Sequence, residues 1–345
     1  MKTQNNISKS NFFKKIFIKI CRLLKFEIID QADLYLPVIA KFANEDLSII
    51  GEKSLTIPMG ITNITRAVKS LDIILRTCAS VNMLSQSKKR LFEEKKSEYT
   101  LRTLNSIIKS INHSKEIFTK INLKITIIDH SSEIEIINQI QLLLKDQFFK
   151  SKIINLKIEN FENQIEKINQ QNKEITNNQI SNMSNIHQSL LIAKECEDLI
   201  YFVEDDYIHS VDSIKEMLLS YEKISTQLKQ ELILCPTDYP YLYSKMEQSN
   251  ILLGNKYHWR QIDESLCTFL TSSLIVKKYW ENLTSICKIE HYPFEKPLHD
   301  IYKKEFCFSP IPSLAVHFTN INSVYGLSPF INYKKIWQEN EITNA

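Results

Sequence analysis

Glycine is scarce in this sequence, with 4 residues among 345. A phosphate-binding loop of the P-loop or dinucleotide type needs several glycines at fixed spacing, because its backbone must approach the phosphates closely. The scarcity excludes both types of loop. Any nucleotide that binds this chain must therefore be held in another way.

The sequence also has no C-x-x-C pair. Its cysteines are odd in number and scattered along the chain: Cys21, Cys78, Cys196, Cys235, Cys267, Cys287 and Cys307. This pattern favours reduced thiols in a cytosolic setting over a disulfide framework or a zinc knuckle. We therefore expect a cytoplasmic protein, with the cytoplasmic face of a membrane as the alternative location.

A strong charge excess and a long apolar run are missing as well. The net charge is +3, with 43% hydrophobic and 24% charged residues, which is ordinary for a soluble globular protein. This balance gives no indication of nucleic-acid binding. No stretch is apolar over the roughly 20 residues that span a bilayer. The start of the chain lacks the features of a cleavable signal peptide.

The most membrane-like segment is FFKKIFIKICRLLKF, residues 12–26, in which Lys and Arg interrupt the apolar residues. Two interpretations are open: a basic helix packed on the main domain, or peripheral contact with an anionic membrane surface. Residues 30–70 contain short apolar runs broken by Pro and Gly, which fit short strands or a hairpin. We expect an N-terminal extension over residues 1–70.

From residue 71 onward, short apolar runs alternate with amphipathic segments. Strands are expected at 71–80, 123–132, 152–159 and in the run ending near 208, and helices at 97–111, 133–148 and 185–196. Ser97 is the expected N-cap of the first helix. Residues 160–180 are rich in Asn and Gln and fit a loop or an exposed helix. The alternation predicts an α/β fold with a mixed, mostly parallel sheet flanked by helices.

Three carboxylates in a row, Glu204, Asp205 and Asp206, follow the apolar run in DLIYFVEDDYIHS, residues 198–210. Like charges repel, so the cluster needs a compensating cation. Carboxylate oxygens suit Mg²⁺ or Mn²⁺, and such an ion would bridge the acids to a diphosphate. In an extended strand, Glu204 and Asp206 share one face. The alternative is a solvated acidic turn, or acids that cap a helix starting near 210–212.

Two other expected strands also end in polar residues, one in Arg76-Thr77 and one in Asp129. Ligands of open α/β sheets bind at the carboxyl ends of the strands. We therefore expect the three polar strand ends to open onto the same edge of the sheet.

The stretches LDIILRTCAS, ITIIDHSS and DLIYFVEDDYIH, in this order and spacing, resemble the nucleotide-binding half of GT-A-fold glycosyltransferases of the family-2-like type. The resemblance covers about residues 71–330. It implies a nucleotide-binding half at 71–210 and an acceptor-binding half at 211–345. The chain departs from the family in its acidic motif, which reads E-D-D instead of D-x-D. NMSNIHQSLLIA also stands where the family has glycines.

Carried over by position, the resemblance implies a nucleotide site lined by Arg76, Thr77, Asp129, Glu204 and Asp205. Asp129 is implied to contact the base or the ribose. Asp206 is implied to be the main ligand of Mn²⁺ or Mg²⁺, assisted by the two acids before it.

His317 ends the apolar run in PIPSLAVHFTNINSVYGLSPF, residues 310–330. The resemblance implies that this late histidine contacts the metal or the diphosphate, and a neutral imidazole suits a borderline cation such as Mn²⁺. The alternative is a histidine that makes only hydrogen bonds.

The segment FEKPLHDIYKKEF, residues 294–306, places His299-Asp300 at an expected helix start after Pro297. In inverting members of the resembled family, an acid at such a helix start acts as the general base, so Asp300 is the expected catalytic residue. The alternative is an acid that caps the helix or favours its dipole. Asp263 and Glu264 are the next candidates for the base.

Several aromatic and basic side chains could form a stacking wall for an acceptor sugar: Tyr239, Tyr241, Trp259 and Arg260, with His258 beside them. The alternative is an aromatic cluster at the edge of the core.

Together these features predict a metal-assisted, inverting glycosyltransferase. It would move a sugar from a UDP- or GDP-sugar donor to a hydroxyl of a glycan or lipid-linked acceptor, with no nucleic-acid partner. Two alternatives remain open: a metal-dependent phosphohydrolase or nuclease built on the same acids, and a non-catalytic nucleotide- or sugar-binding protein with a GT-A core.

Overall fold

The computed structural model describes residues 12–26, 54–57, 60–79, 91–244, 248–319 and 321–342. These residues fall into two compact units, and the division lies between Thr62 and Asn63. Of the region 30–70, in which short strands or a hairpin are expected, residues 30–53 lie outside the described residues, and two short paired strands are present at 54–57 and 60–63.

The first unit contains α1 (Phe12–Leu23), β1 (Ser54–Ile57) and most of β2 (Gly60–Asn63), and the two strands pair in a small sheet. The helix expected within residues 12–26 is therefore present. It ends where Lys25 adopts a φ of 65° and the Phe26 N–H donates to the Cys21 carbonyl over 2.8 Å. This is the Schellman arrangement of a helix end. No helix of the described residues is long and apolar enough to cross a bilayer.

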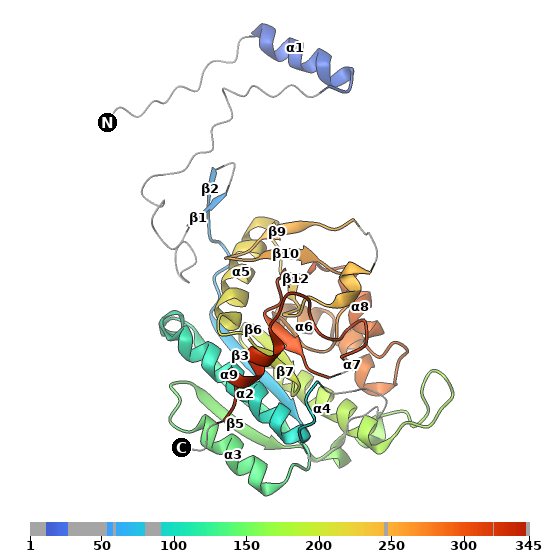
Figure 1. Ribbon diagram of the computed structural model, residues 1–345. Helices are drawn as coiled ribbons and strands as arrows, with labels where there is room; N and C mark the ends of the chain where they lie inside the picture. Colours follow the sequence, from blue (N-terminus) through green and yellow to red (C-terminus); the bar gives the residue numbers. More distant parts are fainter. Residues whose placement is uncertain are drawn as a thin grey trace. The chain divides into compact units, whose positions relative to one another are not determined.

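In the second unit, the described residues form a nine-stranded sheet in the order β5-β4-β3-β6-β11-β8-β12-β10-β9 (Figure 1). The strand bounds are β3 Ser70–Thr77, β4 Asn122–Asp129, β5 Lys150–Asn155, β6 Leu199–Glu204, β8 Ile233–Leu234, β9 Ile251–Leu253, β10 His258–Gln261, β11 Phe269–Ser272 and β12 Cys307–Ile311. The parallel pairs β5-β4, β4-β3, β3-β6 and β8-β12 contain most of the paired residues. The sheet is mixed and mostly parallel, as the sequence predicts.

The predicted alternation of strands and helices is confirmed from β3 to β6. The intervening helices are α2 (Lys96–His113), α3 (Ile134–Leu144) and α4 (Asn177–Lys194). The prediction that Ser97 caps α2 is wrong, because Lys95 holds the N-cap position and no side chain caps it. α4 begins eight residues earlier than predicted. Thr176 caps it by accepting the Gln179 N–H over 3.1 Å.

Alternate side chains of the central strands pack into two hydrophobic cores, one on each face of the sheet, because strand side chains alternate between faces. Leu71, Ile73 and Leu75 of β3 pack in the core that also holds buried residues of α2, α3 and α5 (Ser213–Leu228). Ile74 packs in the core formed with α4, α6 (Ser273–Lys278), α7 (Trp280–Lys288) and α8 (Lys296–Tyr302). The sheet is therefore covered by helices on both faces.

A small sheet and a terminal helix complete the second unit. β7 (Tyr207–His209) pairs antiparallel with β13 (Ala315–His317), and His317 lies opposite Tyr207. α9 (Tyr333–Glu339) packs beside this pair through Ile336 and Trp337. The pairing places the end of β13 next to the carboxylate cluster that follows β6.

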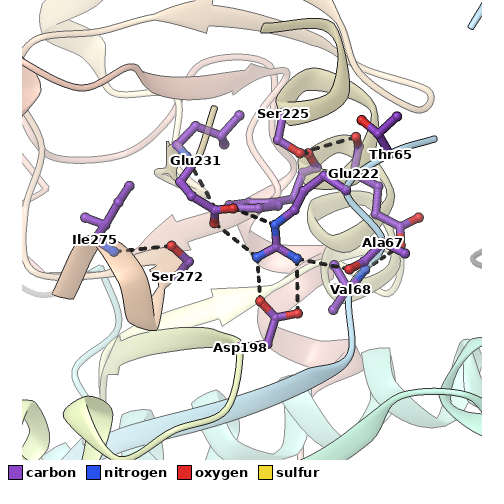
Figure 2. A network of polar contacts seen from close by, with 12 residues as sticks. Thr65, Ala67, Val68, Asp198, Glu222, Ser225, Glu231, Ser272 and Ile275 are labelled. Atoms are coloured by element: carbon purple, nitrogen blue, oxygen red, sulfur yellow. Dashed lines mark hydrogen bonds and ion pairs between the residues drawn. The ribbon is translucent and has the colours of Figure 1, made fainter. Parts of the chain in front are cut away.

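An ion-pair network ties the entry to β3 to the start of β6 (Figure 2). Arg66 contacts Asp198 over 2.5 Å through Nη2 and Glu231 over 2.6 Å through Nε. Asp198 also accepts the Lys69 N–H over 2.7 Å. Nearby, Glu222 of α5 accepts the Val68 N–H over 2.7 Å. The network fixes the amino ends of these strands, at the opposite end from their polar carboxyl ends.

Glu222 makes the stability of the second unit depend on pH. Burial raises the pKa of this carboxyl group to about 7, although the Val68 N–H and Arg66 oppose the shift. A raised carboxyl pKa means that the folded state holds the proton more tightly than the unfolded chain does. The stabilisation is present below the unfolded pKa of about 4.3 and is lost as the pH rises towards 7.

Glu222→Gln should therefore raise the free energy of unfolding at pH 8 by about 1–3 kcal/mol and change it little at pH 4. Urea denaturation across this pH range checks the prediction. Glu281→Gln is the matched control, because Glu281 is 84% exposed. An equal effect of Glu222→Gln at both pH values would contradict the assignment.

Candidate functional site

The polar strand ends lie at one edge of the sheet, as the sequence predicts. In the parallel ladder, Arg76 of β3 pairs with Glu204 of β6, and Thr77 of β3 pairs with Asp129 of β4. The prediction that Glu204 and Asp206 share the face of one extended strand is wrong. β6 ends at Glu204, and the next two residues form the turn into β7.

This edge opens into a cleft of about 870 Å³. It is lined by the end of β3, the start of α2, the β6–β7 turn, the end of β13, the start of α4 and segments near 169–171 and 290–295. Its lining includes the side chains of Arg76, Thr77, Lys96, Asn182, Asn185, Glu204, Asp205, Asp206, Glu295, His317, Thr319 and Tyr325.

Glu204 faces the guanidinium of Arg76, with 3.0 Å between Oε1 and Nη2. Thr268 Oγ1 accepts the Glu204 N–H over 3.1 Å and donates to Oε2 over 3.3 Å. Burial raises the pKa of Glu204, and the charge of Asp206 adds to this rise while Arg76 opposes it. Arg76 therefore stabilises the ionised form of Glu204, which burial and the charge of Asp206 disfavour.

Asp205 turns towards α2. Its carboxylate accepts the Thr100 hydroxyl over 2.9 Å and the Cys78 N–H over 3.3 Å, and it lies 3.4 Å from Lys96 Nζ. Burial lowers the pKa of Lys96, but Asp205 and its neighbours outweigh this effect and raise it overall. Lys96 is thus a fixed cation in the cleft. The role of Lys96 could not be predicted from the sequence, because no local pattern connects a lysine at a helix start with an acid 109 residues away.

Asp206 faces His317 and Thr319. Its Oδ2 accepts the Thr319 hydroxyl over 2.6 Å and lies 3.3 Å from His317 Nε2. Burial opposes ionisation of Asp206, but His317, Thr319 and Lys96 together lower its pKa to about 2. Burial likewise disfavours the charged form of His317, yet Asp206 raises its pKa overall. The two side chains hold each other as an ion pair at the cleft surface.

The pair has the donor set of a partial metal site. His317 Nδ1 lies 2.9 Å from the Tyr325 carbonyl, so this nitrogen carries the proton and Nε2 faces Asp206. Metal-binding histidines commonly donate their other N–H to a carbonyl in this way. Within the described ranges, however, no group of three His, Cys, Asp or Glu side chains could hold a metal. An ion here would need further oxygens from a ligand, which is the usual manner of Mg²⁺ with phosphates.

Asp129 is buried, and both oxygens of its carboxylate accept hydrogen bonds from neighbouring residues. Oδ1 accepts the hydroxyls of Thr77 over 2.7 Å and of Ser132 over 2.5 Å, and Oδ2 accepts the Ser132 N–H over 3.1 Å. Thr77 lines the cleft, whereas Asp129 is not among the lining residues. The structure thus places Asp129 directly behind the edge, where it orients Thr77.

Amide side chains of α4 also line the cleft, and one of them contacts Arg76. Asn182 Oδ1 accepts from Arg76 Nη1 over 3.1 Å. Asn185 is 5% exposed and donates to the Ile128 carbonyl over 3.0 Å. Its Oδ1 has no hydrogen-bond partner among the described residues. A buried acceptor without a partner is uncommon in native proteins. The oxygen is itself buried, so it does not form part of the exposed surface of the cleft.

The residues expected to form an acceptor wall do not line the cleft. Trp259 and Tyr239 are fully buried, so neither ring is open to a sugar. Arg260 binds Asp238 over 2.6 Å, and the Tyr241 hydroxyl donates to the Glu264 carbonyl over 2.5 Å. These aromatic rings therefore pack in the core or at its edge. Tyr325, whose ring centre lies 5.3 Å from that of Tyr241, does line the cleft.

The prediction that His299-Asp300 lie at a helix start is wrong, because α8 begins at Lys296 with Glu295 at its N-cap position. Asp300 is half-buried and pairs with Lys303 over 2.7 Å, outside the cleft lining. The hydrogen bond from Lys303 lowers the pKa of Asp300. Glu295, which sequence reasoning passed over, lines the cleft. Asp263 and Glu264 do not line it.

The chain matches no protein-family model and no curated protein. Solved structures similar to it include UDP-glucose pyrophosphorylase complexed with UDP-glucose, at 7% identity and a TM-score of 0.35, covering 72% of this chain and 91% of that one. UTP-bound UGPase from Acinetobacter baumannii has 8% identity and a TM-score of 0.36, covering 79% and 92%. S. aureus TarS 1–349 has 10% identity and a TM-score of 0.34, covering 70% and 60%. Likeness this distant carries no functional argument.

The contact between Arg76 and Glu204 should be important for stability. Arg76→Met leaves Glu204 beside two further acids without its cation, so we expect a loss of about 3 kcal/mol in the free energy of unfolding. The double variant Arg76→Met/Glu204→Gln should recover most of that loss, because it removes the unpaired charge.

Urea denaturation of the single and double variants measures this coupling. Lys335→Met breaks the exposed pair between Lys335 and Glu339 and serves as the control, with an expected cost below about 1 kcal/mol. A double variant as unstable as Arg76→Met alone would show that Glu204 does not depend on Arg76.

Proposed function

We propose that this protein is a glycosyltransferase that uses a nucleotide-activated sugar with the help of a divalent cation. The observation that carries the proposal is the edge of the sheet, where three acids and three cations meet in one cleft. Glu204, Asp205 and Asp206 are paired there with Arg76, Lys96 and His317, respectively. Such an edge can receive an anionic diphosphate at its cations and a metal at its acids.

Asp206 and His317 are the proposed protein ligands of Mn²⁺ or Mg²⁺. The ion would replace the proton on His317 Nε2 that pairs with Asp206, because only a neutral imidazole nitrogen binds a metal. Their facing atoms are 3.3 Å apart. Two adjacent ligands of an octahedral ion at about 2.1 Å are separated by roughly 3 Å, so the spacing fits. The ion would neutralise negative charge on the departing diphosphate. Thr319 holds Asp206 in the required orientation through its hydroxyl.

The nucleotide is proposed to bind along the ends of β3 and β4. Arg76 and Lys96 supply positive charge, while Thr77 and the acids Glu204 and Asp205 line the cleft. Asp129 would act through Thr77, whose hydroxyl it accepts over 2.7 Å. The donor is expected to be a UDP- or GDP-sugar.

The sugar is proposed to lie against the amide wall of α4. Neutral amides both donate and accept hydrogen bonds, which suits the hydroxyls of a sugar. Asn178, Asn182 and Asn185 of α4 line the cleft. Tyr325 gives the cleft an aromatic surface near His317, and it takes the place proposed earlier for Tyr239, Tyr241, Trp259 and Arg260.

The reaction needs a base if it inverts the anomeric centre. The acceptor oxygen attacks the anomeric carbon, the bond to the diphosphate oxygen breaks, and the acceptor proton passes to a carboxylate. Glu295 lines the cleft at the N-cap position of α8. Asp300, paired with Lys303 outside the cleft, would need α8 to move. We therefore favour Glu295 over Asp300 as the base.

Asp206→Asn should reduce the affinity for UDP or GDP in the presence of Mn²⁺ by about 10- to 100-fold, as expected from losing about 1.5–3 kcal/mol of charged interaction. Binding without metal should change little. Isothermal titration with and without Mn²⁺ measures both. Asp212→Asn is the control, because Asp212 is outside the cleft lining. Equal affinities with and without Mn²⁺ for the unmodified chain would contradict the metal site.

Glu295→Gln and Asp300→Asn form a matched pair that locates the base. We expect Glu295→Gln to lower sugar transfer by about 10²–10⁴-fold with donor affinity preserved, and Asp300→Asn to leave transfer near normal. A donor screen that measures nucleoside diphosphate release supplies the assay. Loss of transfer in Asp300→Asn alone would return the role to Asp300. Release of pyrophosphate from UTP or GTP mixed with a sugar 1-phosphate would indicate nucleotidyl transfer instead.

A further inference from the structure

The basic residues of this chain are segregated. Seven of the 43 Lys and Arg residues and none of the 40 Asp and Glu residues fall within residues 1–26. The remainder of the chain has 36 basic and 40 acidic residues, so it carries a slight acidic excess. The net positive charge of the protein therefore comes from its first 26 residues, which include α1. Such asymmetry indicates an interaction with an anionic partner.

The same segment carries a concentration of exposed apolar side chains. Six of the 19 exposed large apolar residues of the described chain lie within positions 16–26: Ile16, Phe17, Ile20, Leu23, Leu24 and Phe26. Leu23 is 82% exposed and Leu24 is 64% exposed. A soluble surface rarely gathers so many in one short segment unless something covers them.

The helix separates the two kinds of residue by its geometry. At 3.6 residues per turn, the five exposed apolar positions from Ile16 to Leu24 fall within an arc of about 120°. Lys19 and Arg22 lie outside this arc, as does the half-buried Ile18. α1 is thus amphipathic, with an apolar face and a face rich in cations.

We propose that α1 docks the protein on a membrane surface that contains anionic phospholipids. The apolar face would enter the boundary between head groups and acyl chains, and the lysines would reach the lipid phosphates. At 12 residues the helix is too short to span a bilayer, so it lies in the plane of the surface. Charge complementarity favours this partner over a neutral one, since the segment contains cations and no acids.

The proposal does not depend on the chemistry of the cleft. Binding to lipid can be measured with the full chain and without a sugar donor, while nucleotide binding reports separately on the second unit. A failure of vesicle binding would therefore leave the proposed transferase function untouched, and the reverse also holds.

Sedimentation with vesicles of phosphatidylcholine, alone or mixed with phosphatidylglycerol, tests the docking. We expect binding to the mixed vesicles only, and weaker binding as salt is added. Lys19→Gln should weaken it about 5-fold, the effect of about 1 kcal/mol per basic residue. Leu23→Glu should abolish it. Leu142→Glu and Lys335→Gln are matched controls, because Leu142 of α3 is 68% exposed and Lys335 is 69% exposed, and neither lies on α1.

Each other outcome overturns the proposal. Equal binding to neutral and anionic vesicles would show that the cations of α1 do not select the lipid. Binding that survives Leu23→Glu would place the contact elsewhere. Lack of vesicle binding together with self-association, measured by light scattering and lost in Leu23→Glu, would identify a second copy of the chain as the partner. Urea denaturation of each variant, with a midpoint unchanged from the unmodified chain, verifies that the second unit is folded.

Discussion

The repulsion among Glu204, Asp205 and Asp206 is the constraint on which the arrangement of the cleft depends. Each acid meets a different cation, and each cation comes from a different element: Arg76 from β3, Lys96 from α2 and His317 from β13. The charges remain close to the surface, where a ligand can reach them. The cluster therefore fixes the positions of three elements around one opening.

The pairing of strands brings these acids and cations together. Parallel pairing places Arg76 beside Glu204, because the register of β3 and β6 aligns their last residues. The antiparallel pair β7-β13 returns the chain so that His317 lies opposite Tyr207, next to Asp206. Both pairings join residues more than 100 positions apart. The site is thus a product of sheet topology, and a shift of register by one residue would turn these side chains to the other face.

The sequence was sufficient to predict the alternating elements from β3 to β6 and the shared edge of their polar ends, because local periodicity and strand direction determine both. It was insufficient for α8. Pro297 suggested that the helix starts near His299, whereas the helix begins at Lys296. It could not distinguish a buried Trp259 from an exposed one, because an aromatic residue in a short strand fits either environment. Lys96 and Glu295 were missed since their importance arises only from contacts between distant segments.

The residues at the amino ends of the central strands stabilise the fold, whereas those at the carboxyl ends are suited to bind a ligand. At the amino end, Arg66 contacts both Asp198 and Glu231, and no side-chain atom of these three residues is buried without a partner in the described chain. At the carboxyl end, the charged side chains of Arg76, Lys96 and the three acids line a cleft, where a ligand can reach them. Charges that pair only with one another hold strands together, whereas charges that line a cleft can also bind a ligand. The carboxyl end is therefore the side of the sheet where binding is to be sought.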